Sequence, residues 1–189
     1  MSPQKNPPST ETPLHYEDAL LSRILKEVKI IAMVGASANW VRPSNFAMKY
    51  LQGKGYRVIP VNPRQQGEEI LGEMTYANLA DIPGPFDMVD IFRTSNAAGA
   101  IADEAIAVAA EKAIKVVWMQ LGVRNDAAAE RLEAAGLIAI IGIAFSLFHL
   151  YAAYFGQGES YLHNTIHVSL VMVLCVLLKP AGRSSWKEP

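Results

Sequence analysis

The sequence is poor in features that would place it in several common classes of protein. Cys175 is the only cysteine among 189 residues, so an internal disulfide and a cysteine-based metal site are excluded. A disulfide-stabilised secreted protein is therefore not expected. The formal net charge is −1, which gives no sign of a nucleic-acid-binding surface. Residues 1–15 lack the apolar core of a signal peptide, and their Pro/Ser/Thr-rich composition predicts a disordered N-terminal arm.

Charged residues are almost absent from the last quarter of the chain. Glu159 is the only one between Glu133 and Lys179. Uncharged stretches at 137–155 and 161–178 flank the polar turn GQGES, and a helix of nineteen residues is about 28 Å long, close to the ~30 Å hydrocarbon thickness of a bilayer. We therefore predict an apolar, transmembrane helical hairpin over 142–178 and a basic tail over 179–189. The alternative is that residues 137–141 complete a sheet and only the remainder meets a membrane or a second copy.

Apolar strand-like runs and amphipathic helical segments alternate before this hairpin. Strands are expected at 30–34, 56–62, 88–92, 115–119 and from residue 137, and helices at 16–28, from residue 43, at 97–112 and at 126–135. This alternation predicts an α/β fold, a Rossmann-like doubly wound parallel sheet of about five strands, over residues 16–141. Thr94 or Ser95 and Asp126 are the expected helix caps, and Pro60 indicates an edge or bulged strand.

A glycine turn, Gly35-Ala36-Ser37, follows the first strand, and a helix restarts at Pro43. Free backbone N–H groups and the positive end of a helix dipole at such a junction favour a phosphate group. The turn lacks the G-x-G-x-x-G glycines of a dinucleotide site, and no acid ends the second strand. Asn62-Pro63-Arg64 stands there instead, which favours a ligand with an extra ribose phosphate.

Together, the segments VGAS, RPS, GYRVIPVNPR, GEEILGE, DMVDIFR and VVWMQLG resemble the small bacterial CoA-binding proteins. Their domain is similar to the CoA-binding domain of the succinyl-CoA synthetase α subunit, and the resemblance covers about residues 20–137. It implies a stand-alone Rossmann-like module that binds coenzyme A or acyl-CoA without catalysis. The site residues that it implies are Gly35, Ala36 and Ser37 in the phosphate turn, Arg42, Pro43 and Ser44 beside the pyrophosphate, Asn62, Pro63 and Arg64 at the adenosine end, and Arg93, Thr94 and Ser95 at the mouth of the third strand.

The chain departs from this family where the fifth strand should lead into an Asp-Arg-Cys-Pro segment, because Gly136-Leu137 runs into IAIIGIAFSLFHLYAAYF instead. An alternative function is that of a subunit of an enzyme that handles CoA thioesters, of the acyl-CoA ligase type. The ligases of this resemblance use a histidine as phosphate carrier, and the α/β part has no histidine after His15. Asp90, in an apolar strand, is interpreted as a structural hydrogen-bonding group rather than a catalytic acid.

The tail carries a second resemblance. FSLFHLYAAYFG, the Ile166-His167 step and LLKPA, within residues 143–182, are similar to the first helices of fused permeases of tripartite ATP-independent periplasmic (TRAP) transporters. This implies a regulatory or fusion fragment with a permease partner; a homo-oligomer is the other partner considered. The positive-inside rule then places the CoA-binding domain in the cytoplasm, attached to the inner membrane. For His149, His163 and His167 we expect hydrogen bonding or an interfacial position rather than a metal site.

Overall fold

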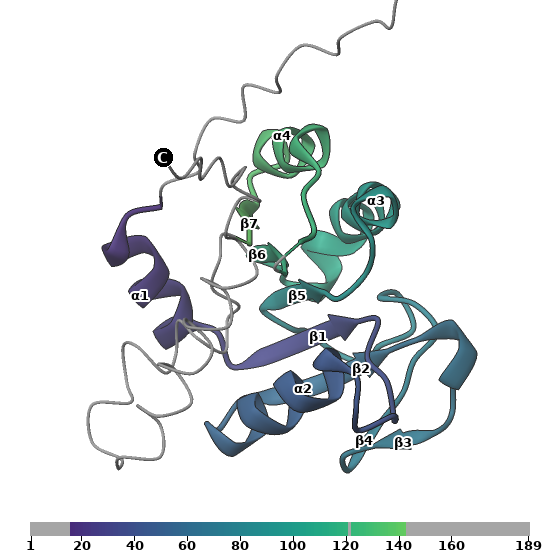
Figure 1. Ribbon diagram of the computed structural model, residues 1–189. Helices are drawn as coiled ribbons and strands as arrows, with labels where there is room; N and C mark the ends of the chain where they lie inside the picture. The colour runs from purple at the N-terminus through teal and green to yellow at the C-terminus, as the bar shows by residue number, and fades with distance from the viewer. Residues whose placement is uncertain (1–15, 121, 143–189) are drawn as a thin grey trace, which may run out of the picture. The chain divides into compact units, whose positions relative to one another are not determined.

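A five-stranded parallel sheet with helices on both faces forms the part of the protein that the computed structural model describes, residues 16–120 and 122–142 (Figure 1). The elements in chain order are α1 (Asp18–Glu27), β1 (Ile30–Val34), α2 (Pro43–Gly53), β2 (Arg57–Val61), the 3-10 helix η1 (Pro63–Gln65), β3 (Glu69–Ile70), β4 (Glu73–Met74), β5 (Met88–Ile91), α3 (Ser95–Lys112), β6 (Val116–Met119), α4 (Asp126–Ala134) and β7 (Ile138–Ile141). The predicted Rossmann-like α/β fold and its five parallel strands are confirmed.

The strand order, β2-β1-β5-β6-β7, places the switch point of the topology at β1. The chain leaves β1 for β2 on one side and then crosses to β5 on the other, and all four pairings in this sheet are parallel. In open α/β sheets a ligand binds beyond the carboxyl ends of the strands where the order reverses. The carboxyl ends of β1, β2 and β5 are therefore where a site is expected.

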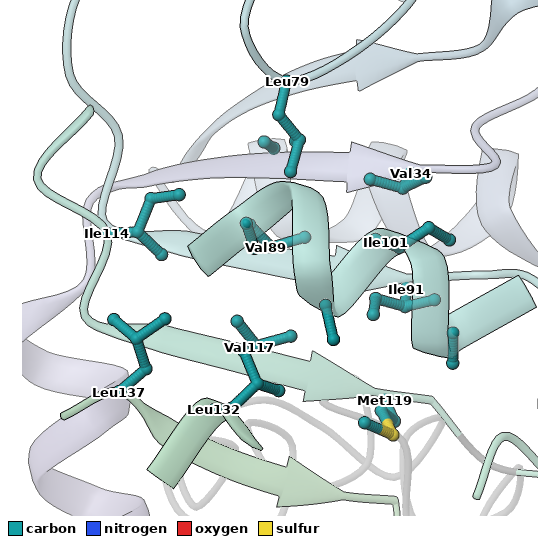
Figure 2. Close-up of a cluster of buried hydrophobic side chains, with 14 of the residues drawn as sticks. Val34, Leu79, Val89, Ile91, Ile101, Ile114, Val117, Met119, Leu132 and Leu137 are labelled. Atoms are coloured by element: carbon teal, nitrogen blue, oxygen red, sulfur yellow. The ribbon is translucent and has the colours of Figure 1, made fainter. Parts of the chain in front are cut away.

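One face of the sheet is buried under α3 and α4. Val89 and Ile91 of β5 pack with Ile101 of α3, and Val117 of β6 packs with Leu132 of α4 (Figure 2). Each of these side chains is at most 9% exposed. Burial of apolar surface is the main stabilising contribution to the fold, because each Å² removed from water contributes about 25 cal/mol.

The opposite face is covered by α1 and α2 (Figure 1). The amphipathic helix predicted at 16–28 buries Leu21, Ile24 and Leu25 of α1. The hydroxyl of Tyr56 donates to the carbonyl of Leu25 over 2.7 Å and fixes α1 beside the start of β2. A layer of apolar side chains thus isolates this face of the sheet from water as well.

Pro60 lies in β2. This strand is at the edge of the sheet, which is one of the two positions that Pro60 indicated. The backbone N–H and C=O groups of the odd-numbered residues of β2 point toward β1. The carbonyl of Val61, for example, accepts from Gly35 N over 2.9 Å. The backbone nitrogen of Pro60 therefore faces away from β1, so its lack of an N–H costs no hydrogen bond between the two strands. Its carbonyl accepts from Tyr76 N over 3.0 Å.

The long connection between β2 and β5 holds a small hairpin that the sequence did not predict. β3 and β4 pair antiparallel, and Leu71 and Gly72 join them with positive φ angles of 49° and 84°. Two consecutive positive φ values are typical of a type I′ hairpin turn, which is normally signalled by Asn-Gly or Asp-Gly. Farther along this connection, Asp81 N donates to the Asn78 side chain over 2.9 Å and closes a turn.

Two predicted helix caps are wrong in detail. Thr94 is at the N-cap position of α3, but its side chain accepts no capping hydrogen bond. The N-cap of α4 is Asn125, whose side chain accepts from Ala128 N, and Asp126 is the first helical residue. Gly136 follows the end of α4 with a φ of 80°, the left-handed conformation that is common after a helix C-terminus.

The predicted N-terminal arm, the hairpin beyond residue 142 and the basic tail lie outside the described residues, as do the three tail histidines and Cys175. Within residues 16–120 and 122–142, none of the helices combines the length and the apolar character needed to cross a bilayer.

Candidate functional site

A pocket of about 390 Å³ opens at the carboxyl ends of β1, β2 and β5, at the switch point of the sheet. Its volume falls in the range of ordinary ligand sites. It is lined by Gly35, Ala36, Ser37, Arg42, Pro43, Ser44, Asn62, Arg64, Phe92 and Arg93. Nine of these ten residues are among those that the sequence predicted; Pro63, Thr94 and Ser95 are the predicted residues that do not line it.

Gly35 allows the chain to turn sharply at the end of β1. Its φ is +90°, and a Cβ atom there would meet the carbonyl oxygen of Phe92 and lie 2.8 Å from Cδ of Arg93. Only glycine adopts this conformation without strain and leaves room for the end of β5. The close approach of β1 and β5 thus brings Arg93 to the same pocket as the glycine turn.

The turn after Gly35 exposes backbone donors to the pocket. Among the described residues, the N–H groups of Ala36 and Ser37 have no hydrogen-bond acceptor. The loop beyond them is held by its own bonds: Val41 N donates to the Asn39 side chain over 3.0 Å, and the Asn45 side chain donates to Ser37 O over 2.9 Å. The turn is therefore fixed in place while its donors remain available.

The N-terminus of α2 faces the same space. Arg42 is the N-cap, and Pro43 opens the helix, where its missing N–H costs no hydrogen bond. The first-turn N–H groups of a helix have no partner within the helix, so that of Ser44 adds a donor at the positive end of the helix dipole. Turn and helix together form a concentrated set of N–H groups suited to phosphate oxygens.

Asn62 holds the glycine turn against the end of β2. Its Nδ2 donates to the Ala36 carbonyl over 2.8 Å, and its Oδ1 accepts from Arg64 N over 3.0 Å. Gln65 supports the same connection, because its Oε1 accepts from Ala38 N over 3.3 Å. Both ends of the Asn62 amide are thus engaged within the protein, so this side chain shapes the pocket.

Three arginines surround the pocket. Within the described part of the chain, Arg42, Arg64 and Arg93 form no ion pair and no side-chain hydrogen bond. By contrast, Arg57 pairs with Glu73 over 2.9 Å and Arg131 with Asp103 over 2.8 Å, both away from the pocket.

No acidic residue is among the described residues that line the pocket. A cluster of unneutralised guanidinium groups around free N–H groups favours an anion with more than one phosphate.

The predicted residues at the start of α3 have other roles. Ser95 Oγ accepts from Arg124 N over 3.0 Å, which ties α3 to the loop before α4. Asp90 lies inside the sheet and is fully buried, and its Oδ1 accepts from Gln120 Nε2 over 2.8 Å. The bond to Gln120 bears out the interpretation of Asp90 as a hydrogen-bonding group. Phe92 was missed because nothing in a strand-end phenylalanine distinguishes a pocket residue from a core residue.

Comparison with known proteins places this pocket in context. A family model described as a CoA binding domain matches residues 29–145. The uncharacterised protein YneT of Bacillus subtilis is 34% identical over 131 residues, which cover 69% of this chain and 93% of YneT. The solved structure of a hypothetical protein from Pyrococcus horikoshii OT3 is 34% identical, with a TM-score of 0.66 over 73% of this chain and 92% of that one.

A more distant match shows the fold alone. The dinucleotide-forming acetyl-coenzyme A synthetase 1 of Ca. Korarchaeum cryptofilum, solved with phosphate and ADP, has a TM-score of 0.52 at 20% identity. The match covers 62% of this chain but only 26% of the synthetase. The fold described above therefore also occurs as one part of a much larger enzyme.

Proposed function

The chain belongs to the CoA binding domain family, and on that premise we propose that the pocket at β1, β2 and β5 binds coenzyme A as a module without catalysis of its own. The observation that carries this proposal is the convergence of Arg42, Arg64 and Arg93 on one pocket with free backbone N–H groups. Coenzyme A carries a pyrophosphate and a ribose phosphate, so it needs several cationic partners at once. Arginine serves this purpose well because its planar guanidinium binds phosphate oxygens in pairs.

We assign the parts of the ligand from the elements that surround the pocket. The pyrophosphate lies on the N–H groups of Ala36, Ser37 and Ser44, at the N-terminus of α2. The ribose phosphate lies at Arg64, which follows β2. Arg93 reaches the pocket from the end of β5 and neutralises the charge of the pyrophosphate from the opposite side.

Binding without reaction is favoured over the acyl-CoA ligase alternative by the chemistry of the lining residues. The described lining residues supply guanidinium groups, N–H groups and the hydroxyls of Ser37 and Ser44, but no histidine or carboxylate that would activate a nucleophile. The proposal extends to free coenzyme A; the lining residues give no apolar channel that would select an acyl group.

Calorimetric titration of the full chain tests this proposal with four ligands: coenzyme A, its analogue without the ribose phosphate, acetyl-CoA and NAD. We expect coenzyme A to bind at least tenfold more tightly than NAD, and acetyl-CoA to bind like coenzyme A. Arg64→Ala should weaken the binding of coenzyme A about tenfold or more, because one charge-assisted hydrogen bond is lost. The same variant should leave the affinity for the analogue without the ribose phosphate nearly unchanged.

The matched control is Arg131→Ala, which removes an arginine that is paired with Asp103 far from the pocket. Equal weakening by both variants would point to general electrostatics instead of a site. Failure of coenzyme A to bind the wild-type chain at all would refute the proposal.

We also propose, from the sequence of the tail, that the hairpin over residues 142–178 attaches this module to the inner face of a bacterial membrane. If the resemblance to TRAP permeases holds, a permease is its partner. The support is the near-absence of charge in that stretch and the basic residues that follow it. Membrane fractionation with an alkaline carbonate wash tests it: release of the chain into the wash would exclude a spanning hairpin.

A further inference from the structure

We propose that Asp90 and Gln120 form a buried proton-binding site, in which a proton on Oδ2 of Asp90 is donated to Oε1 of Gln120. The site lies inside the sheet and is separate from the pocket, so the inference does not depend on the proposed ligand. Proton binding converts the carboxylate to a neutral acid, and no other bond changes.

The position of the pair follows from strand register. Asp90 of β5 lies between Met33 of β1 and Trp118 of β6, so these three side chains point to the same face of the sheet. The chain neighbours of Asp90, Val89 and Ile91, belong to the core under α3 and α4. Asp90 therefore faces the layer of α1 and α2, and Gln120, two residues beyond Trp118, directs its amide to the same side.

The hydrogen bonds in this cluster are incomplete without a further proton. Gln120 Nε2 donates to Asp90 Oδ1 over 2.8 Å, but Asp90 Oδ2 and Gln120 Oε1 are buried acceptors with no donor among the described residues. Leaving a buried polar atom unsatisfied costs about 1–3 kcal/mol. A single proton on Oδ2 satisfies both atoms, because a carboxylic acid and a primary amide then exchange two parallel hydrogen bonds.

In the described part of the chain, no cation compensates for a charge on Asp90. Its neighbours Met33 and Trp118 are uncharged, and Asp90 itself has no exposed surface. The charged side chains of the two covering helices are all exposed: Asp18, Arg23, Lys26, Glu27 and Lys49.

Two phenols of this layer are engaged elsewhere: Tyr56 donates to Leu25 O, and Tyr16 accepts from Ile141 N. The third, Tyr50 of α2, contacts Lys54 through its ring. An isolated carboxylate in such surroundings is strongly disfavoured. In agreement with this geometry, burial raises the pKa of Asp90 to about 7, although the bond from Gln120 lowers it.

Trp118 supplies a built-in alternative for the ionised state. Its Nε1–H is buried and has no acceptor among the described residues, and it is the register neighbour of Asp90. When Asp90 loses its proton, we expect the carboxylate to turn toward this indole, because both side chains lie on the same face of the sheet. The cluster therefore has two arrangements, one with the acid paired to Gln120 and one with the carboxylate turned toward Trp118.

The test compares the pH dependence of urea unfolding in the full chain and in Asp90→Asn, which mimics the protonated acid by offering an N–H donor to Gln120. Because the folded pKa lies above the value of 3.8 for a free aspartate, the folding equilibrium constant of the wild type should fall as pH rises. Between about pH 5 and about pH 8 the fall should be roughly a hundredfold. Asp90→Asn should lose this component and be the more stable protein at the higher pH.

The infrared spectrum gives a second readout that does not require the variant to fold. At about pH 6 exposed carboxyl groups are ionised, so a protonated carboxyl band in the folded wild type reports a buried acid. We expect the band to persist in the control Asp126→Asn and to vanish in Asp90→Asn. Absence of the band in the wild type, or an unchanged pH dependence in folded Asp90→Asn, would overturn the proposal.

Discussion

Gly35, at the end of β1, lies directly against the main-chain carbonyl of Phe92, at the end of β5, and no side chain fits between them. β1 and β5 are neighbouring parallel strands, and their ends meet so closely here that Gly35 has no room for a Cβ atom. This contact also places the free N–H groups of the glycine turn and the Arg93 side chain at one pocket. The geometry of the site is thus linked to one residue that has no side chain.

Gly35→Ala should therefore be strongly destabilising, by about 2–4 kcal/mol, because it adds a steric clash to an unfavourable φ. Urea unfolding monitored by circular dichroism measures the loss. The matched control is Gly55→Ala, since Gly55 has nearly the same φ, +91°, but no atom within 4 Å of a new Cβ. Equal losses for both variants would show that the contact with Phe92 contributes nothing.

Asn62→Ala should lower both stability and ligand affinity. It removes the bond to Ala36 O and the acceptor for Arg64 N, a loss of about 1–3 kcal/mol at typical hydrogen-bond values. Asn62→Asp keeps the acceptor but replaces the donor facing Ala36 with an anionic oxygen, so affinity for an anion should fall further than in Asn62→Ala. Calorimetric titration with coenzyme A orders the variants, and an Asn62→Asp that binds as well as the wild type would contradict this role.

Asp87 should contribute stability that disappears in acid. Its carboxylate accepts from Lys29 N at 2.9 Å, Ile30 N at 3.0 Å and Lys115 Nζ at 3.0 Å. Partial burial raises its pKa, but these bonds outweigh it, and the folded pKa lies below the usual 3.8. The contribution is therefore present above about pH 4 and is lost as pH falls through the folded pKa.

Asp87→Asn should lower the free energy of unfolding by about 1 kcal/mol at pH 7, with the difference shrinking toward zero in acid. Unfolding curves at a series of pH values measure this trend. A difference between the two proteins that stays constant down to about pH 2 would mean that the charge of Asp87 is unimportant.

Asn125→Ala should cost about 1 kcal/mol or more. The side chain caps α4 through Ala128 N at 3.0 Å and also donates to Ser95 O at 3.1 Å. Asp126→Ala is the informative comparison, since Asp126 pairs only with the neighbouring Arg124 among the described residues and is largely exposed. Asp126→Ala should lower the free energy of unfolding by only a few tenths of a kcal/mol. If Asp126→Ala lowers the thermal stability more than Asn125→Ala does, Asp126 is the cap.

The fold and most of the candidate site could be predicted because both depend on strand order and periodicity. Buried parallel strands appear in a sequence as apolar runs, and their carboxyl ends meet at one edge of the sheet. Gly35, Asn62 and Arg93 each follow such a run, and this alone is enough to predict that they lie at the same edge. The exact cap of α4 was not predictable in the same way, because Asn125 and Asp126 are both good caps and only the backbone geometry decides between them.

The features that the sequence did not reveal depend on tertiary contacts. The turn at Leu71-Gly72 requires a positive φ at a leucine, which local propensity disfavours; the Leu71 carbonyl accepts from Gln52 Nε2 of α2 over 3.1 Å. The pairing joins Asp90 of β5 to Gln120, which lies thirty positions later, directly after β6. No pattern within a single segment indicates such a pair, so its chemistry becomes visible only once the sheet is assembled.

Pro60 has a further consequence, for self-association. A free sheet edge is a template on which another chain can add a strand, and this is a route to aggregation. On the outer side of β2, Pro60 offers no N–H, while its carbonyl and the N–H of Asn62 are already bonded to Tyr76. Strand addition at this edge would have to break those bonds and would still lack one donor. Pro60 therefore protects the β2 edge against strand addition by a second chain.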